Sequence, residues 1–582
     1  MHYHSQQKKI IPRPVVKAMP QLPDMHPLMQ RIYSARGISS IQQLQHSLAH
    51  LPSPWLLSGM DKMVQLLLEA LEKQQKIMIV ADFDADGATS CAVALKGLAL
   101  LGFDDVQFIV PNRFEFGYGL TPEIVNLAAT ENPQVILTVD NGISSVAGVA
   151  RAKKLGFTVL ITDHHLPGER LPDADAIVNP NISGQEFPSG ALAGVGVLFY
   201  VLMALRNRLR EQNTFADSGL ALPNLAQLLD YVALGTVADV VPLDFINRIL
   251  VYQGLQRIRS SHCHAGLKAL IEVSGRQQQS LQASDLGFAL GPRLNAAGRM
   301  DDMTLGIQCL VTDDSNLARE IALQLDDFNA DRRAIEGQMK QEAMELLAQM
   351  KAFDAEHIPA GICLFDQDWH PGVIGILAGR VKDRLHRPVI AFAPSSAEGE
   401  IKGSARSIPG LHIRDVLSDI AAAHPNLLSK FGGHAMAAGM TIKMSDYPPF
   451  SMAFNEFVAE RLQAINIEQT IYSDGQLPEQ QLTLQFAELL QQGGPWGQEF
   501  PEPVFDGVYD VIQVRIVGQQ HLKLVLREPF GEVLVDGIAF FVEQPENWLG
   551  IRQIKVAYNL AINEYRGARN IQLIIQYLEK KV

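Results

Sequence analysis

Three aspartates follow one short apolar run at every second position. The stretch "IMIVADFDADG" places Asp82, Asp84 and Asp86 directly after the apolar residues 77–81. In an extended chain, side chains two residues apart point to the same side. If the extended geometry persists past Ala81, the three carboxylates share one face.

Acids and histidines recur at the ends of two later apolar runs. The stretch "VILTVDNG" contains Asp140, and "TVLITDHH" ends with Asp163, His164 and His165. We expect these runs to be strands of one parallel sheet, in which ligands gather at the carboxyl ends of the strands. The three runs then present acids or histidines at one edge.

Coulomb repulsion indicates what such a cluster is for. Two carboxylates about 4 Å apart repel by roughly 4 kcal/mol at an effective dielectric of 20, so several cannot stay ionised together without a counter-charge. Carboxylates with one or two imidazoles suit Mg²⁺ or Mn²⁺ better than Zn²⁺. Capping a turn or a helix would explain one acid after a strand, and it is the simpler interpretation of Asp163 alone. It does not explain three in alternation.

The elements that must position these residues alternate between strand-like and helix-like patterns. This alternation predicts a parallel, doubly wound α/β sheet. The predicted strands are Ile77 to Ala81, Val106 to Val110, Val135 to Val139 and Val159 to Thr162, and the predicted helices between them include Thr89 to Leu101 and Ser144 to Leu155.

The rest of the chain changes pattern twice. Residues 281–350 are polar and helical, which predicts a connecting helix. A second, smaller α/β pattern begins near Gly361 and includes the glycine-rich "FGGHAMAAGM". The last hundred or so residues are alternating strands separated by turns, which predicts a small antiparallel barrel. The predicted parts are an N-terminal extension at 1–55, the parallel-sheet domain at 56–280, the connecting region at 281–352, the second α/β domain at 353–466 and the barrel at 467–582.

The overall composition is that of a packed globular protein. The chain has 582 residues, too many for one core, with 47% hydrophobic and 19% charged residues. A formal charge of −14 argues against a wholly basic coat but leaves room for a local nucleic-acid groove. The uncharged stretch from Phe187 to Leu205 contains Pro188 and three glycines, which favours a buried helix over a membrane span.

The expected compartment is the cytoplasm. The four cysteines lack CxxC spacing, which fits free thiols in a reducing environment. The start of the sequence has no apolar core of a signal peptide. We therefore expect a cytosolic enzyme.

An ordered set of motifs resembles the DHH phosphoesterase superfamily, in its branch of single-strand-specific 5′ to 3′ DNA exonucleases. The likeness runs from about residue 60 to the end. The motifs are DFDADG at 82–87, VDNG at 139–142, TDHH at 162–165, GTVADVVPL at 235–243, GPRLNAAGRM at 291–300, GSARS at 403–407, GGHAMAAG at 432–439 and NEYRGARNIQLII at 563–575.

The resemblance implies a centre with two Mn²⁺ or Mg²⁺ ions. The implied ligands are Asp82, Asp84, Asp86, Asp140, His164 and Asp239. Asp140 would bridge the ions, and His165 would stabilise charge at the scissile phosphate. Asp163 would orient the neighbouring imidazoles. Some relatives carry a histidine four residues before the DxD pair, where this chain has Val80, and that departure favours the exonuclease branch over small-nucleotide phosphodiesterases.

The resemblance also implies where the substrate is gripped. The second α/β domain resembles the DHHA1 domain, and Ser404, Arg406 and Arg293 are candidates to bind the 5′ end. Further candidates are Asn295, Arg299, Gly432, Gly433 and His434, with Arg113 a weaker one. For His434 a packing role is an equal alternative.

The barrel resembles an OB-fold, which binds single strands through basic and aromatic residues. The candidate contacts are Arg515, His521, Lys523, Arg527, Tyr565, Arg566 and Arg569. For any single one of them, a solvated strand face is the simpler interpretation.

The implied activity is two-metal hydrolysis of single-stranded DNA from the 5′ end, releasing 5′-mononucleotides in DNA repair, mismatch repair and recombination. The expected partners are single-stranded DNA, a single-strand-binding protein and a helicase, with no membrane. Two alternatives remain: a DHH phosphodiesterase of short oligonucleotides, and a catalytically inactive DHH scaffold that binds DNA.

Overall fold

The computed structural model describes residues 8–15, 24–111, 119–217, 221–349, 359–395, 397–428, 430–463, 469–565 and 567–581. The chain divides into two compact units. The larger contains Ile10–Asp326 and Ile471–Val582, and the smaller contains Asp327–Thr470. Each unit is described by itself.

A five-stranded parallel sheet forms the first half of the larger unit. The strand order is β3-β2-β4-β5-β6, and each neighbouring pair is parallel. The strands are β2 (Ile77–Ala81), β3 (Val106–Ile109), β4 (Val135–Val139), β5 (Thr158–Thr162) and β6 (Ala176–Val178). All residues of β2 and β4 are buried, as expected for a sheet covered on both faces. The predicted fold class and the four predicted strands are confirmed; β6 was not predicted.

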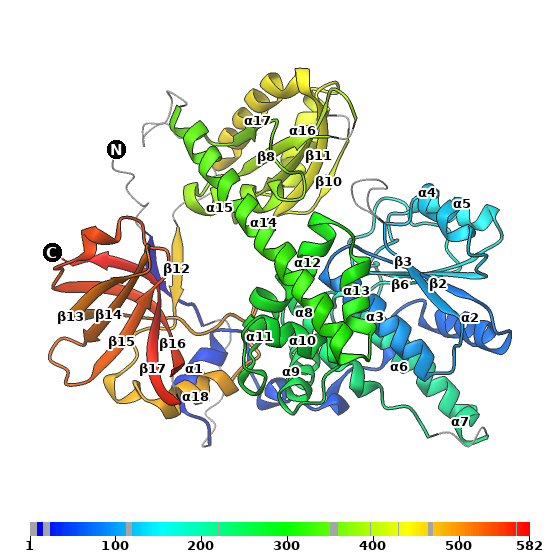
Figure 1. The fold of residues 1–582 in the computed structure, drawn as a ribbon, viewed down its shortest axis with the longest axis horizontal. Helices are drawn as coiled ribbons and strands as arrows, with labels where there is room; N and C mark the ends of the chain where they lie inside the picture. The colour runs from blue at the N-terminus through cyan, green and yellow to red at the C-terminus, as the bar shows by residue number, and fades with distance from the viewer. Residues whose placement is uncertain are drawn as a thin grey trace. The chain divides into compact units, whose positions relative to one another are not determined.

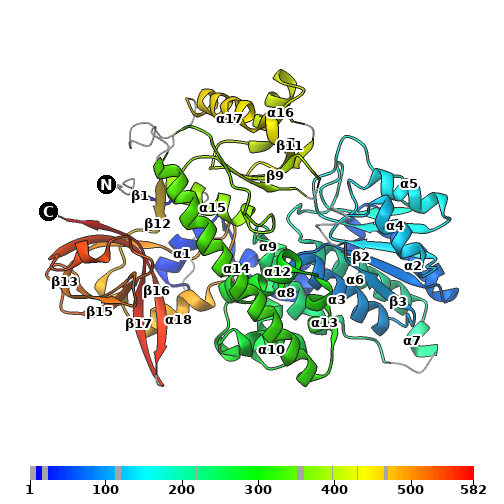
Figure 2. The ribbon, with the colours of Figure 1, turned by 45° about the horizontal axis from the view of Figure 1, so that its top comes forward.

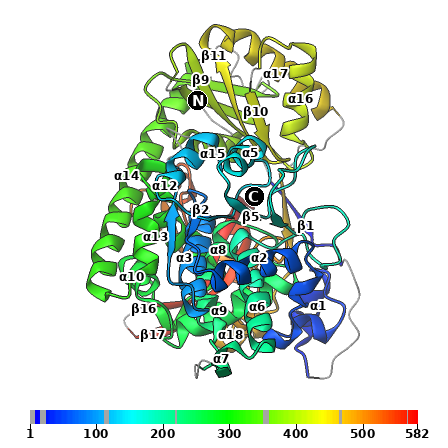
Figure 3. The same cartoon turned by 90° about the vertical axis from the view of Figure 1, so that its right-hand side faces the viewer.

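Helices cover both faces of this sheet (Figure 1, Figure 3). On one face, α4 (Pro122–Ala129) and α5 (Val146–Lys154) share a core with β2, β4 and β5. On the other lie α3 (Ala85–Leu100) and α6 (Gly194–Glu211), while α2 (Met60–Glu72) packs beside α6 and β6. Helix α6 contains much of the uncharged stretch noted in the sequence and is largely buried. Within the described residues, no helix has the length and apolar character that a membrane span needs.

A helical region completes this half of the larger unit. Its buried centre is α8, in which every residue from Leu229 to Thr236 is buried. The helices are α7 (Thr214–Asp217), α8 (Leu229–Ala238), α9 (Phe245–Arg259), α10 (Ala265–Val273), α11 (Ala283–Asp285), α12 (Gly291–Met300) and α13 (Thr304–Val311). The predicted connecting helix is α14 (Ser315–Gln349), whose sequence begins in the larger unit and ends in the smaller.

The smaller unit contains a mixed five-stranded sheet in the order β10-β11-β9-β8-β7. Only β7 and β8 are parallel. Helix α15 shares one core with the C-terminal part of α14, and α16 and α17 share another. The elements are β7 (Ile362–Phe365), α15 (Ile374–Leu385), β8 (Val389–Pro394), β9 (Glu400–Arg406), α16 (Ile413–Ala423), β10 (Lys430–Gly433), β11 (Ala437–Lys443) and α17 (Tyr447–Leu462).

The last strands close into a barrel in the order β13-β14-β15-β17-β16. The strands are β13 (Phe505–Val517), β14 (His521–Arg527), β15 (Leu534–Ala539), β16 (Gln553–Tyr565) and β17 (Ala568–Lys580). The prediction of a wholly antiparallel barrel was wrong in one pairing, because β15 and β17 run parallel. Strand β17 is antiparallel to β16, its hairpin partner, and parallel to β15, its other neighbour in the barrel. The hairpin of β16 and β17 extends beyond the barrel (Figure 2).

The segment predicted as an N-terminal extension packs against residues 470–500, which precede the barrel in the sequence. Strand β1 (Lys9–Pro12) pairs with β12 (Thr470–Ser473), and α1 (Pro27–Ser34) lies near α18 (Leu484–Gln492). The buried guanidinium of Arg36 donates to both carboxylate oxygens of Asp474 at 2.8 and 2.9 Å. The ring of Tyr33 stacks against Trp496 and Phe500. Residues near the start of the chain therefore pack against the residues that precede the barrel.

Candidate metal centre

The acids and histidines that follow β2, β4 and β5 meet at the carboxyl edge of the parallel sheet. Three groups of side chains each offer ligand atoms that lie within 4.8 Å of one another. The groups are Asp82, Asp84 and Asp140; Asp86, His164 and Asp239; and Asp140, His164 and His165. Because Asp140 and His164 each belong to two groups, the three form one continuous cluster.

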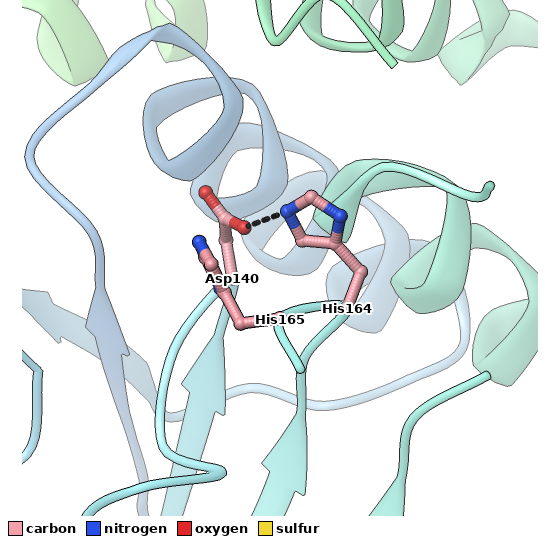
Figure 4. A group of neighbouring side chains, drawn as sticks. All are labelled: Asp140, His164 and His165. Atoms are coloured by element: carbon pink, nitrogen blue, oxygen red, sulfur yellow. Dashed lines mark ion pairs between the residues drawn. The ribbon is translucent and has the colours of Figure 1, made fainter. Parts of the chain in front are cut away.

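The imidazole of His164 lies at the centre of this cluster. Its Nε2 atom is 3.2 Å from Oδ1 of Asp140, 3.4 Å from Oδ2 of Asp239 and 3.9 Å from Oδ2 of Asp86. Figure 4 shows the Asp140 carboxylate pointing at this ring, with His165 alongside. Asp239 comes from the C-terminal end of α8, about 75 residues further along the chain. The place of Asp239 in this cluster was predicted by resemblance alone.

The three aspartates after β2 converge for a different reason from the one expected. Strand β2 ends at Ala81, and Asp84 is the N-cap of α3: its Oδ1 accepts the N–H groups of Asp86 at 2.9 Å and Gly87 at 3.0 Å. The condition set in the sequence analysis is therefore met only as far as Asp84, whose backbone is extended, and not at Asp86. The first N–H groups of a helix have no partners within the helix and need acceptors, so the chain turns into a helix here and Asp86 lies in its first turn.

Asp86 also caps a second helix. Its Oδ2 accepts the N–H of Gly194 at 2.7 Å, and its Oδ1 accepts the N–H of Val195 at 3.0 Å, at the start of α6. A Cβ atom at Gly194 would lie 2.5 Å from Oδ1 of Asp140, so only glycine lets this helix approach so closely. Gly194 is one of the three glycines noted in the uncharged stretch, but nothing in the sequence assigned it this close contact.

Burial and mutual repulsion make the cluster costly without a cation. Asp82, Asp86 and Asp140 are at most 4% exposed. Burial, followed by repulsion from neighbouring carboxylates, raises the pKa of Asp86 to about 7. The same two causes raise the pKa values of Asp82, Asp140 and Asp239 well above the ordinary range. Divalent cations would keep the group ionised, and a set rich in carboxylate oxygen with imidazole fits Mg²⁺ or Mn²⁺.

Asp163 holds the second histidine of the motif. Its Oδ1 lies 2.7 Å from Nδ1 of His165 and accepts the backbone N–H groups of His164 and His165 at 2.7 and 3.0 Å, while its Oδ2 accepts the N–H of Ile143 at 2.8 Å. Burial is the largest single influence and disfavours the charged imidazole, but the hydrogen bond with Asp163 and the negative charges of Asp163, Asp82 and Asp239 together outweigh it and raise the pKa of His165 to about 9. Asp163 thus orients the ring of His165, whereas the ring of His164 faces Asp140.

Two asparagines that the sequence analysis did not identify hold the backbone of the same motif. The amide of Asn179 donates to the carbonyl oxygen of His165 at 2.9 Å, and the amide of Asn181 donates to that of His164 at 2.5 Å. Both follow β6, the strand that was not predicted. Their only sequence signal was the "NPN" turn.

The candidates on α12, which are Arg293, Asn295 and Arg299, all lie in the larger unit. The amide oxygen of Asn295 accepts the N–H of Ala85 at 2.8 Å, between two of the clustered aspartates in sequence. The guanidinium of Arg293 donates to the carbonyl oxygen of Ala289 at 2.6 Å and lies 2.8 Å from Oδ1 of Asp326. Arg299 lies half-buried in the same helix. Arg113 falls outside the described residues.

In the smaller unit, Ser404 and Arg406 lie together on β9. Nη1 of Arg406 donates to Oγ of Ser404 at 3.1 Å, and a Cβ atom at Gly375 would lie 2.8 Å from Nη2 and 2.9 Å from that Oγ. Both side chains therefore point at the first turn of α15, where backbone N–H groups favour an anion. Burial lowers the pKa of Arg406.

The glycine-rich candidates lie at the edge of the same sheet. Gly432 and Gly433 end the edge strand β10, and the N–H of His434 donates to the carbonyl oxygen of Ala437 at 2.8 Å. Gly433 has a φ of +145°, and a Cβ atom there would lie 2.4 Å from that same oxygen. The glycine is therefore required by the turn itself.

The basic candidates on the barrel mostly face acids. Lys523 lies 3.0 Å from Asp536 and Arg527 lies 3.9 Å from Asp510. Arg569 pairs with Glu488 and Glu564 at 2.8 and 2.7 Å. Arg515 is exposed, and His521 accepts the N–H of Phe541 at 3.0 Å. The side chain of Tyr565, and Arg566 as a whole, lie outside the described residues.

Comparisons with known proteins match each part of the chain. The DHH family N-terminal domain matches residues 76–236, the DHHA1 domain matches 358–460 and the RecJ OB domain matches 473–577. Among curated proteins, the single-stranded-DNA-specific exonuclease RecJ of Salmonella typhimurium is 51% identical over 95% of this chain and 96% of its own length. The RecJ of Dickeya dadantii is 52% identical over 96% and 97%.

Solved structures match over nearly the whole chain. The crystal structure of RecJ in complex with Mn²⁺ from Thermus thermophilus has a TM-score of 0.79 at 30% sequence identity, and covers 96% of this chain and 76% of that one. The complex of RecJ with Mg²⁺ from the same organism has a TM-score of 0.72 at 28% identity, over 96% and 75%.

Proposed function

The chain belongs to the RecJ family of single-stranded-DNA-specific exonucleases, and we propose that it hydrolyses single-stranded DNA from the 5′ end to release 5′-mononucleotides. The observation that carries this proposal is the cluster of buried carboxylates around the ring of His164. Such a cluster needs cations, and paired divalent ions are suited to in-line attack on a phosphodiester.

We assign the metal ligands to the side chains whose ligand atoms converge. Six would hold the ions: Asp82, Asp84, Asp86, Asp140, His164 and Asp239; His165, which Asp163 holds, is left for the substrate. Asp140 and His164 each belong to two of the three groups, and since only Asp140 offers two oxygens, it would serve both ions. Mn²⁺ or Mg²⁺ bound here supplies an activated water and stabilises charge on the phosphoryl oxygens.

The remaining roles fall to residues around the cluster. His165, whose ring Asp163 holds through Nδ1, is suited to donate a hydrogen bond to the negative charge of the transition state. Ser404, Arg406 and Arg293 are proposed to bind the 5′ end, and Arg293 would then exchange Asp326 for a phosphate. Further contacts are proposed for Arg299, Gly432, Gly433 and His434, for Arg113, and on the barrel for Arg515, Lys523, Arg527, Tyr565, Arg566 and Arg569.

The direct test is digestion of one strand labelled at its 5′ or its 3′ terminus, with Mn²⁺ or Mg²⁺, beside the matching duplex. We expect labelled mononucleotides to appear first from the 5′ label, and the duplex to resist. Asp84→Ala and Asp140→Ala should reduce the rate to background. The matched control is Asp104→Ala, which removes an exposed aspartate outside the cluster and should leave the rate unchanged.

The same assay separates the alternatives. A phosphodiesterase of short oligonucleotides would degrade di- and trinucleotides in preference to long strands, and an inactive scaffold would bind strands without shortening them. The matches to the RecJ OB domain and to RecJ over nearly the full length favour the exonuclease.

We also propose a cellular setting of DNA repair, including mismatch repair, and recombination in the cytoplasm. An enzyme restricted to single strands needs a helicase to supply unwound DNA, and it meets strands coated by a single-strand-binding protein. Digestion of coated strands, and of duplex with an added helicase, tests both partners.

A further inference from the structure

One aromatic side chain in the helical region that carries Asp239 is almost fully exposed. Phe288 is 84% exposed, while Leu286 and Leu290 on either side of it are fully buried. The three belong to a π-helical turn, Leu286–Leu290, directly before α12. A π-helical turn carries one more residue than an α-helical turn, and such turns occur often at functional sites.

This turn packs on the end of the helix that carries Asp239. A Cβ atom at Gly287 would lie 3.2 Å from Cγ1 of Val237, and one at Gly291 would lie 3.1 Å from Cβ of Ala238. Phe288 lies between these two glycines in the sequence. It therefore projects into solvent from a segment that contacts the two residues preceding a proposed metal ligand.

The rim of the cluster at this point is apolar. Val240, the residue after Asp239, is 63% exposed and has a φ of +62°, a conformation that a β-branched residue rarely adopts. Val240 offers apolar surface directly after a charged ligand, and Phe288 offers it on the segment that packs against Val237 and Ala238. Phosphate suits the ligands and their cations, whereas the flat apolar face of a nucleobase suits a phenylalanine ring.

We propose that Phe288 is a positioning residue that stacks on a nucleobase next to the phosphate held at the metal centre. This inference depends on the proposed nuclease function. Stacking does not depend on base identity, because every base has a π-face. A ring in this place would fix the strand beside the ligands without selecting a sequence, as an enzyme that digests strands of any sequence requires.

The test is a cycle that combines Phe288→Ala with strands carrying one abasic site at each of the first few positions. On normal strands, F288A should lower kcat/KM by about 10-fold, within the range of alanine substitutions of base-stacking residues. At one position, the abasic site should slow the wild-type enzyme by a similar factor and slow F288A no further. Phe288→Trp should restore most of the rate.

The matched control is Leu127→Ala, which removes an exposed apolar side chain from α4, away from the barrel and from the proposed ligands in the sequence. It should leave kcat/KM and the abasic profile unchanged. Because Phe288 is exposed, F288A should also keep the unfolding temperature of the wild type.

Three results would overturn the proposal: an unchanged kcat/KM in F288A, independent effects of the mutation and the abasic site at every position, or a lowered unfolding temperature that accounts for the lost rate. A failure of the nuclease function itself looks different, since wild-type protein would then leave every strand intact.

Discussion

Asn295 distinguishes a structural role beside the metal centre from a direct role in substrate binding. The sequence predicts a substrate contact, whereas the structure gives its amide oxygen to the N–H of Ala85, 2.8 Å away. Ala85 is the first residue of α3, and the N-cap of this helix already accepts two other N–H groups. Asn295→Ala therefore leaves the N–H of Ala85 without its acceptor.

The size of the effect follows from the tight packing. Ala85 is 1% exposed, and a Cβ atom at Gly298 of the same helix as Asn295 would lie 2.0 Å from the carbonyl oxygen of Phe83. Since the two segments are already in contact, water has little room to replace the amide. A buried donor left without a partner costs about 1–3 kcal/mol. Because Ala85 lies between Asp84 and Asp86, we expect Mn²⁺ affinity to fall on the order of 10-fold as well.

The assay is calorimetric titration of Mn²⁺ without DNA, together with thermal unfolding of the metal-free protein. Asn295→Asp is the matched variant, because its carboxylate can still accept the N–H of Ala85 while it lacks the amide donors. N295A should weaken Mn²⁺ binding and lower the unfolding temperature, whereas N295D, which keeps the acceptor but adds a negative charge near the cluster, should bind Mn²⁺ at least as tightly as the wild type. If N295A leaves both unchanged and only raises KM for single-stranded DNA, the reasoning is refuted and the residue is a substrate contact.

Three further predictions concern the packing of Gly194, the pH dependence of stability and the ion pair of Arg36 with Asp474. Gly194→Ala should weaken Mn²⁺ binding at least 10-fold in the same titration, because its Cβ atom would lie 2.5 Å from Oδ1 of Asp140 and displace that carboxylate. Burial, followed by repulsion from a nearby arginine, lowers the pKa of His46 to about 4 from 6.5, so the unfolded chain binds more protons between these values and stability falls as the pH drops from 6.5 to 4. His46→Gln should flatten the unfolding temperature across that window. Arg36→Ala should destabilise the larger unit by about 1.5–3 kcal/mol in denaturant titrations, because it removes both charge-assisted hydrogen bonds to the buried carboxylate of Asp474 and leaves the more distant Arg13, 3.7 Å away, as its ion-pair partner.

Controls for these variants come from open or exposed positions. Gly337→Ala in α14 has nothing within 4 Å of the new atom, so Mn²⁺ binding should be unchanged and the helix slightly more stable. Lys73→Ala removes an exposed ion pair at 3.4 Å and should cost less than about 1 kcal/mol. Normal Mn²⁺ binding in G194A, an unaltered pH profile in H46Q, or a cost of R36A no larger than that of K73A would contradict the respective argument.

The local pattern of the sequence was enough for the parallel sheet and the edge that carries the site. Strands β2 and β4 are predicted to the residue, because buried parallel strands are short, uninterrupted apolar runs. The acids at their ends could be recognised as a metal centre from charge repulsion alone. The identities of the more distant candidates, such as Asp239, came from resemblance to a family, since nothing local to a helix end announces a ligand.

The tertiary structure decided what each polar group does. Asp84 and Asp86 are two residues apart in the sequence, but helix capping and not strand alternation fixes their positions. Asp84 accepts an N–H group at the start of α3, and Asp86 accepts one at the start of α6. The same two carboxylates belong to the cluster. The amide oxygen of Asn295, a predicted substrate contact, accepts the N–H of Ala85, about 210 residues away in the sequence. The periods of strands and helices indicate which face of each element is buried. Hydrogen bonds between segments so far apart in the sequence depend on how the two segments pack, and no local sequence pattern records that packing.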